Sequence, residues 1–290
     1  MSPKLTRRQF IAGSLAAGAA LSAGDLSAAS VPKIKSLTDR VKLGRTGIEV
    51  SYLGFGTGTV GWNKQSNQTR LGTVEFARMI RHAFDQGVNY FDCADIYGSH
   101  PYIRASLKGI PRDRYVLESK VWFRTSKDAQ AALDRFLQEL NTDYIDVLLL
   151  HCIDDTNWQA DLGQMMDVLE EAKQKKRIRA HGISLHSLDV MKQAAEDPWV
   201  DFALCRINPL GVKMDAPTDQ VVPVLKRLHE AGKGVTGIKI LGEGKIADQR
   251  EQSLRYVLGL DCVDAVVIGF ESKAQVDDIL SLGRKALSGW

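Results

Sequence analysis

Residues 144–151 read YIDVLLLH, an apolar run that ends in a histidine. A run of this length and composition is typical of a buried parallel strand. Two other strand-like runs have polar ends: Asp92 and Tyr97 follow the run 89–91, and Lys120 closes the run 115–119. Burying such a group without a partner costs several kcal/mol, so packing alone explains these positions poorly.

Strand-like and helix-like segments alternate along the chain after a short hairpin at residues 41–50. This alternation favours an α/β fold, a closed parallel (β/α)8 TIM barrel, over an open doubly wound sheet. Consecutive barrel strands place their carboxyl ends side by side on the face that carries active sites, so we expect Asp92, Tyr97, Lys120 and His151 to meet in one cleft. The expected strands are 52–56, 89–94, 115–121, 145–152, 179–184, 202–208, 235–240 and 265–269; the expected helices are 74–86, 102–108, 127–140, 162–175, 188–196, 221–230, 249–258 and 274–280.

Three motifs, DCADIY at 92–97, SK at 119–120 and LLH at 149–151, together resemble the Asp, Tyr, Lys, His tetrad of the aldo-keto reductases. LGRTG at 43–47 and LGFGT at 53–57 resemble that family's opening hairpin and first strand, and the resemblance extends over residues 40–282. It implies a nicotinamide nucleotide, NAD or NADP, as hydride donor for a carbonyl substrate, or as acceptor from an alcohol.

The tetrad allows acid–base chemistry at the carbonyl oxygen. Tyr97 is the expected general acid and base, although a free phenol has a pKa of about 10. We expect the ammonium of Lys120 to lower this pKa, Asp92 to hold Lys120, and His151 to orient the substrate oxygen. For each of the four residues taken singly, a structural role is as well supported as a catalytic one. Their occurrence together in this order favours a catalytic role.

Two other functions stay open. In a Schiff-base lyase, Lys120 would attack a carbonyl, but the carboxylate of Asp92 keeps it protonated and disfavours this chemistry. A barrel that binds a nucleotide or a carbohydrate without turnover is the other alternative. Nothing in the sequence excludes it.

The expected cofactor site departs from the family pattern. The family's Ser-Asn pair is Ser184-Leu185 here, Arg206 and Asn208 stand near the usual Gln, and no Tyr follows the seventh strand. Glu271 stands where a 2′-phosphate would be held, so it slightly favours NAD over NADP. Lys273 is the one nearby cation, and we expect it to point into solvent from the start of the last helix. The expected cofactor-binding residues are Gly56, Thr57, Asp92, Ser184, Arg206, Asn208, Lys239, Gly242, Gly244, Gly269, Glu271 and Ser272.

Aromatic residues follow several of the expected strands. Trp62, Trp122, Phe123 and Trp158 are candidates to line the mouth of the substrate site. Such rings often stack on sugar faces, so the expected small-molecule carbonyl or alcohol substrates include sugars and keto-sugars. The short loops predict an open substrate site.

The amino-terminal residues 1–29 do not fit the barrel pattern. Arg7 and Arg8 precede a mildly apolar stretch and small residues suited to cleavage, which resembles a twin-arginine (Tat) export signal. We therefore expect a signal peptide at 1–29, a barrel domain at 30–290, a transient encounter with the Tat translocase and a periplasmic protein. The stretch is too short and too weakly apolar for a stable membrane span.

Composition is ordinary for a globular protein: 290 residues, 44% hydrophobic and 25% charged, with a formal net charge of +3. Without a basic cluster, nucleic acid is not an expected partner. The four cysteines Cys93, Cys152, Cys205 and Cys262 have no CxxC spacing and are expected as small buried side chains, and no metal site is expected.

Overall fold

The computed structural model describes residues 34–122 and 128–288. The leader prediction for residues 1–29 and the aromatic candidate Phe123 lie outside the described residues. Among the described residues, none of the helices has the length and apolarity to cross a membrane.

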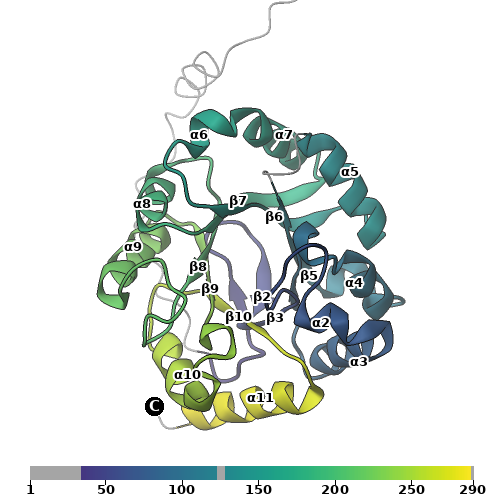
Figure 1. Ribbon diagram of the computed structural model, residues 1–290, viewed down its shortest axis with the longest axis vertical. Helices are drawn as coiled ribbons and strands as arrows, with labels where there is room; N and C mark the ends of the chain where they lie inside the picture. The colour runs from purple at the N-terminus through teal and green to yellow at the C-terminus, as the bar shows by residue number, and fades with distance from the viewer. Residues whose placement is uncertain (1–33, 123–127, 289–290) are drawn as a thin grey trace, which may run out of the picture. The chain divides into compact units, whose positions relative to one another are not determined.

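Eight parallel strands close into a barrel in the order β10-β3-β4-β5-β6-β7-β8-β9, which confirms the predicted fold class. Figure 1 shows these strands as a central ring with the helices around it. Large apolar side chains such as Phe55, Phe91 and Phe202 are fully buried. The strands are β3 (Leu53–Gly56), β4 (Tyr90–Asp92), β5 (Val116–Val121), β6 (Ile145–Ile153), β7 (Ile178–Leu185), β8 (Phe202–Arg206), β9 (Gly234–Ile238) and β10 (Ala265–Gly269).

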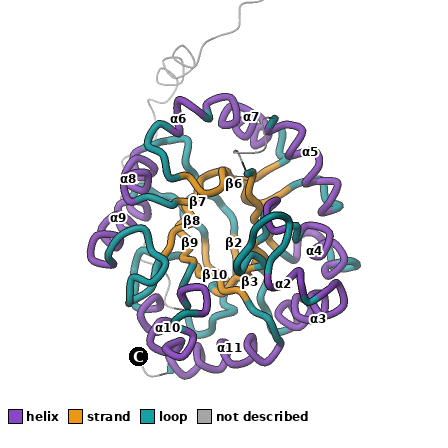
Figure 2. Tube along the Cα trace, in the orientation of Figure 1, coloured by secondary structure: helices purple, strands orange, loops and turns teal. Residues whose placement is uncertain are grey.

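The helices surround the barrel strands, and the loops between helix and strand are mostly short (Figure 2). The α-helices are α2 (Asn67–Arg70), α3 (Gly72–Asp85), α4 (His100–Leu107), α5 (Ala129–Leu140), α6 (Trp158–Asp161), α7 (Gly163–Gln174), α8 (Leu188–Glu196), α9 (Thr218–Glu230), α10 (Arg250–Leu258) and α11 (Lys273–Leu287). The 3₁₀ turns are η1 (Asp95–Tyr97), η2 (Arg112–Arg114), η3 (Gly242–Gly244) and η4 (Ala247–Gln249).

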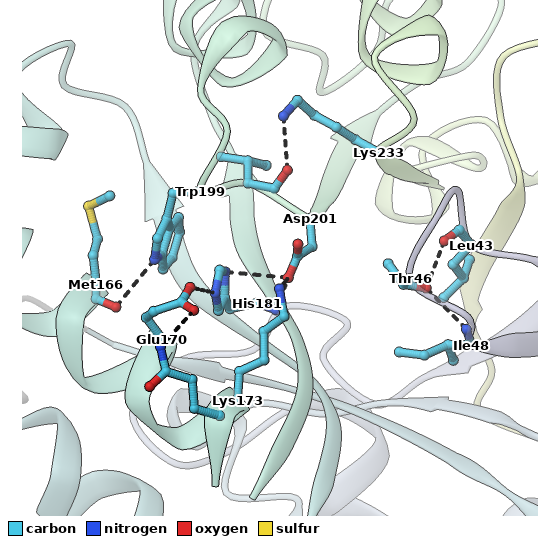
Figure 3. Close-up of polar contacts among 12 residues, drawn as sticks. Leu43, Thr46, Ile48, Met166, Glu170, Lys173, His181, Trp199, Asp201 and Lys233 are labelled. Carbon is cyan, nitrogen blue, oxygen red and sulfur yellow. Dashed lines mark hydrogen bonds and ion pairs between the residues drawn. The ribbon is translucent and has the colours of Figure 1, made fainter. Parts of the chain in front are cut away.

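The predicted hairpin forms an antiparallel pair, β1 (Arg40–Lys42) with β2 (Glu49–Ser51). Its turn is held by Thr46, whose Oγ1 donates to the carbonyl of Leu43 at 2.7 Å and accepts from the N–H of Ile48 (Figure 3). The N–H of Gly44 donates to Asp264, just before β10. The hairpin therefore lies against the amino-terminal ends of the strands, opposite the predicted catalytic face.

A second polar cluster lies away from that face, between β7 and α7 (Figure 3). His181 is 1% exposed, stacks on Trp199 at 4.3 Å, and has Nε2 2.9 Å from Glu170. Lys233 donates to the carbonyl oxygens of residues 197 and 200. These contacts satisfy buried polar groups of the scaffold.

Several elements differ from expectation in their boundaries or their presence. Strand β6 continues past His151 to Ile153, with a register irregularity after Leu150 and with Cys152 at a φ of 58°. Helix α11 extends to Leu287 rather than 280. The four-residue helices α2 and α6 were not predicted, because one helical turn gives no periodic signal.

Candidate active site

Three of the four tetrad residues meet at the carboxyl ends of β4 and β6, which flank β5 in the barrel. Asp92 is the last residue of β4, Tyr97 ends the turn η1, and His151 lies near the end of β6. Gly98 has a φ of 63° and closes η1, a conformation that glycine adopts without strain. Tyr97 is thereby held over the barrel mouth next to the strand ends.

The hydroxyl of Tyr97 lies 3.3 Å from Nε2 of His151, and their rings meet edge to face with centroids 5.5 Å apart. The ring of Trp122 contacts the imidazole at 5.3 Å. The phenol and the imidazole thus present polar atoms to one point, where both can contact a single substrate oxygen.

The loop after β3 fixes the ring of Tyr97. A Cβ atom at Gly58 would lie 2.2 Å from that ring, and one at Gly61 would lie 2.3 Å from it. Only glycine allows the backbone to approach so closely. The ring is therefore packed between the loop and the strand ends.

Lys120 lies behind these residues, 1% exposed. Its ammonium forms an ion pair with Asp92 and donates to the carbonyl of Cys93 at 3.0 Å. Burial lowers the pKa of Lys120, but Asp92 and Glu118 raise it by more, and the net pKa lies well above its usual value. Lys120 is thus a buried, protonated support of the site.

Lys120 lowers the pKa of Tyr97, as expected, but the expectation that this brings the pKa below its usual value is wrong for this structure. Burial raises the pKa of the Tyr97 phenol, and the ammonium of Lys120 only partly offsets it. Asp92 also raises this pKa, because its charge opposes phenolate formation. Tyr97 is therefore a protonated phenol at neutral pH.

A cavity of about 700 Å³ opens beside Tyr97 and His151. Volumes of this order are usual for ligand sites. Of the predicted cofactor-binding residues, the cavity wall includes Gly56, Asp92, Ser184, Arg206, Lys239, Gly244, Gly269 and Glu271. The other four lie outside the wall: Thr57 and Asn208 are buried and bonded to the scaffold, Gly242 is buried in η3, and Ser272 caps α11.

At one end of the cavity, Ser184 and Arg206 lie near the tetrad. Arg206 donates to Asp215 at 2.9 Å and contacts the ring of His186, which sequence reasoning did not single out. Among the described residues, Nε of Arg206 is buried without a hydrogen-bond partner. Ile238 stands at the end of β9 where the sequence lacks the stacking Tyr.

At the other end, the glycine-rich loop carries charge as well as backbone donors. Lys239 pairs with Glu243 at 2.6 Å, and Glu243 has a φ of 59°. Arg250 also lines the wall and pairs with Asp278 at 2.5 Å. The expectation that Lys273 is the one nearby cation is therefore wrong, because Arg250 reaches the cavity. Lys273 itself is exposed at the start of α11, as expected, and lies outside the cavity wall.

Two of the candidate tryptophans line the cavity and one does not. Trp62 is 62% exposed and meets Trp122 edge to face at 5.7 Å. Trp158 is 1% exposed, donates to Gln193 and packs near Trp199. The prediction that Trp158 lines the mouth is wrong, because helix α6 turns it into the core.

The hydrogen-bond donors and cations of the cavity wall suit both the nicotinamide end and the phosphates of a nicotinamide dinucleotide. Lys239 and Arg250 bring two cations to the cavity wall beside a glycine-rich loop, and such donors suit a diphosphate; Arg206 and Ser184 offer further donors on the same wall. Ile238 offers an apolar surface in place of an aromatic ring.

The sequence of this chain resembles those of known proteins. A model described as the aldo/keto reductase family matches residues 52–255. L-galactose dehydrogenase of Arabidopsis thaliana is 27% identical over 220 residues, covering 71% of this chain and 66% of that protein. The chain spans 66% and 60% of the lengths of the first two curated relatives that it matches.

Solved structures share the fold. The aldo-keto reductase-like protein PA4992 of Pseudomonas aeruginosa superposes with a TM-score of 0.73 at 24% identity, covering 88% of this chain and 99% of that one. An aldo-keto reductase of Klebsiella pneumoniae in complex with NADPH gives a TM-score of 0.64 at 19% identity, covering 86% and 89%. At these identities the likeness shows the barrel fold.

Proposed function

This chain belongs to the aldo/keto reductase family, a family of NAD(P)-dependent oxidoreductases, and from that premise we propose that it interconverts a small carbonyl compound and its alcohol. The observation that carries the proposal is the placement of the Tyr97 hydroxyl 3.3 Å from His151 at the cavity wall, with Lys120 buried behind. The nucleotide, when bound, supplies the hydride.

The chain's own residues would handle the proton. In reduction, Tyr97 donates its proton to the carbonyl oxygen as negative charge develops there, and His151 orients that oxygen. In the reverse direction the Tyr97 phenolate takes the proton back. Lys120 stabilises the phenolate by its charge, and Asp92 holds Lys120 in place.

Ser184 and Arg206 would hold the nicotinamide end of the nucleotide, and Lys239, Gly244 and Arg250 its phosphates. The substrate would enter beside Trp62 and Trp122. Their flat rings suit a sugar or keto-sugar, which makes this the substrate class to test first.

Two measurements test the proposed function. Native mass spectrometry of freshly purified protein should show a bound nucleotide or take one up on addition. NADH and NADPH oxidation should then be followed with a panel of aldehydes, ketones and keto-sugars. Binding without turnover on any of them would favour the non-catalytic barrel. A lyase is disfavoured, because Lys120 is buried, paired and absent from the cavity wall.

We expect NADH to bind several-fold more tightly than NADPH. Glu271 lines the cavity and accepts from Asn67 at 2.8 Å, so a carboxylate is held where a 2′-phosphate would add like charge. Titration of both nucleotides by fluorescence quenching measures the preference.

Glu271→Lys should narrow or invert that preference. Glu171→Lys is the matched control, since it changes net charge equally on helix α7, away from the cavity. A clear NADPH preference in the unaltered protein would contradict the assignment of Glu271.

We further propose that residues 1–29 are a Tat signal peptide and that the protein acts in the periplasm. The Arg7-Arg8 pair, the apolar stretch and the small residues after it support this. Because the Tat route carries folded proteins, a tightly held nucleotide could be exported with the barrel.

Changing both Arg7→Lys and Arg8→Lys should leave the protein in the cytoplasm with its leader uncleaved, because the translocase reads the arginine pair. Cell fractionation and the mass of the amino terminus measure this. Lys4→Gln removes a leader charge but keeps the pair, so it should be exported normally. Export of the double variant at the normal level would mean that another route is used.

A further inference from the structure

A second carboxylate, Glu118, shares the ammonium of Lys120 with Asp92. Glu118 lies in β5 directly opposite Asp92 of β4 and is 0% exposed. Its Oε2 accepts from the hydroxyl of Tyr90, and its Oε1 lies 3.0 Å from Nζ of Lys120. Within the described residues, Oε1 has no partner in hydrogen-bond geometry.

The charges in this buried group do not balance. Two carboxylates and one ammonium leave one excess negative charge, and Lys120 is the only cation that either carboxylate contacts among the described residues. The other groups facing it are Tyr90 from β4, Cys93 just after β4, Tyr97 from η1, His151 from β6 and, near Tyr90, Thr236 from β9. An isolated buried charge normally takes up or releases a proton instead of staying charged.

Two carboxyls that share a site do not both ionise readily. Burial raises the pKa of Asp92, and the neighbouring Glu118 raises it further, against the opposing effect of Lys120. One proton between them neutralises the cluster and gives the open Oε1 of Glu118 a partner.

We propose that Asp92 and Glu118 share a single proton in the resting protein, and that Glu118 is a positioning residue that holds Lys120 and sets the charge behind Tyr97. The shared proton is inferred from the buried geometry, whereas the positioning role of Glu118 behind Tyr97 rests on the proposed function. Sequence reasoning missed Glu118, although its spacing of two from Lys120 on a strand places both on one face.

The pair would also set how turnover depends on pH. When it loses its shared proton, the cluster gains a negative charge that opposes phenolate formation, so Tyr97 becomes a weaker acid. Reduction should therefore slow as pH rises through the pKa of Asp92, which burial raises to about 7. Glu118→Gln removes the shared proton and should abolish this alkaline limb in kcat while leaving KM nearly unchanged.

Infrared spectroscopy of the intact protein tests the pair without any substrate. The unaltered protein should show the C=O stretch of a protonated carboxyl at neutral pH, where ordinary carboxyls with a pKa of about 4 are ionised. Glu118→Gln and Asp92→Asn should each lose this band. Glu171→Gln, an exposed glutamate on α7, should keep it.

Glu118→Gln has the same shape and still accepts from Tyr90, so folding should be preserved, and circular dichroism checks this. Tyr90→Phe gives a second reading: losing a hydrogen bond to the carboxylate should keep the band to higher pH. Absence of the band in the unaltered protein, or its survival in Glu118→Gln, overturns the proposal even if the enzyme turns over. If the band is present in the unaltered protein and lost in Glu118→Gln and Asp92→Asn, the shared proton is supported even where no substrate is reduced. In that case only the proposed function fails.

Discussion

Tyr97→Phe should lower the rate of carbonyl reduction by about 10²- to 10⁴-fold, the usual contribution of a general acid. The change removes the transferable proton and keeps the ring, which still fills the space beside Gly58 and Gly61. The nucleotide should bind almost as before, because Tyr97 only borders its site. Steady-state turnover with a verified substrate and nucleotide titration by fluorescence measure the two effects separately.

Tyr256→Phe is a matched control. Tyr256 lies on α10 away from the tetrad and is partly buried, so removal of its hydroxyl should leave turnover unchanged. A Tyr97→Phe enzyme as active as the unaltered one would exclude Tyr97 as the acid. Loss of both binding and folding would instead assign the phenol a structural role.

The barrel could be predicted because its signals are local and repeated. Each long helix shows its own periodicity and each strand its own apolar run, so alternation alone gave the order of the elements. Single turns carry no such signal. Helix α6 was missed for this reason, and with it the burial of Trp158, which depends on how that turn packs on Trp199.

The positions of site residues at strand ends could be predicted from the sequence. Their pKa values and contacts could not, because these depend on burial in the folded protein. Asp92, Tyr97 and His151 meet as expected, because neighbouring strand ends meet in a parallel barrel. The pKa of Tyr97 is raised and not lowered, because burial outweighs the charge of Lys120. The prediction counted only that charge. Arg250 was missed because it begins a helix and reaches the cavity only through the fold.

Lys120→Met should lower the free energy of unfolding at neutral pH by about 3–5 kcal/mol, the usual cost of removing one partner of a buried ion pair. The ammonium is 1% exposed and contacts both Asp92 and Glu118. Its removal leaves at least one buried negative charge with no cation in contact. Turnover should fall as well, because the Tyr97 phenolate loses the one charge that stabilises it.

The pH dependence of this loss gives its cause. In the variant the two carboxyls should stay protonated in the folded state to a higher pH than in the unfolded chain, where their pKa is about 4. Folded protein then binds more protons, so stability falls as pH rises above that value. The deficit against the unaltered protein should therefore be small near pH 4 and grow toward neutrality.

Urea unfolding at several pH values measures this slope, and Asp92→Asn in the Lys120→Met background provides the control. Removing one carboxyl lowers the buried negative charge, so the double variant should be more stable at neutral pH than Lys120→Met alone and less sensitive to pH. A deficit that is equal at every pH, and that Asp92→Asn deepens, would show that Lys120 acts through packing of its aliphatic chain. In that case the charge of the cluster would not hold the site together, and the loss of turnover in Lys120→Met would have to be explained by displacement of Tyr97.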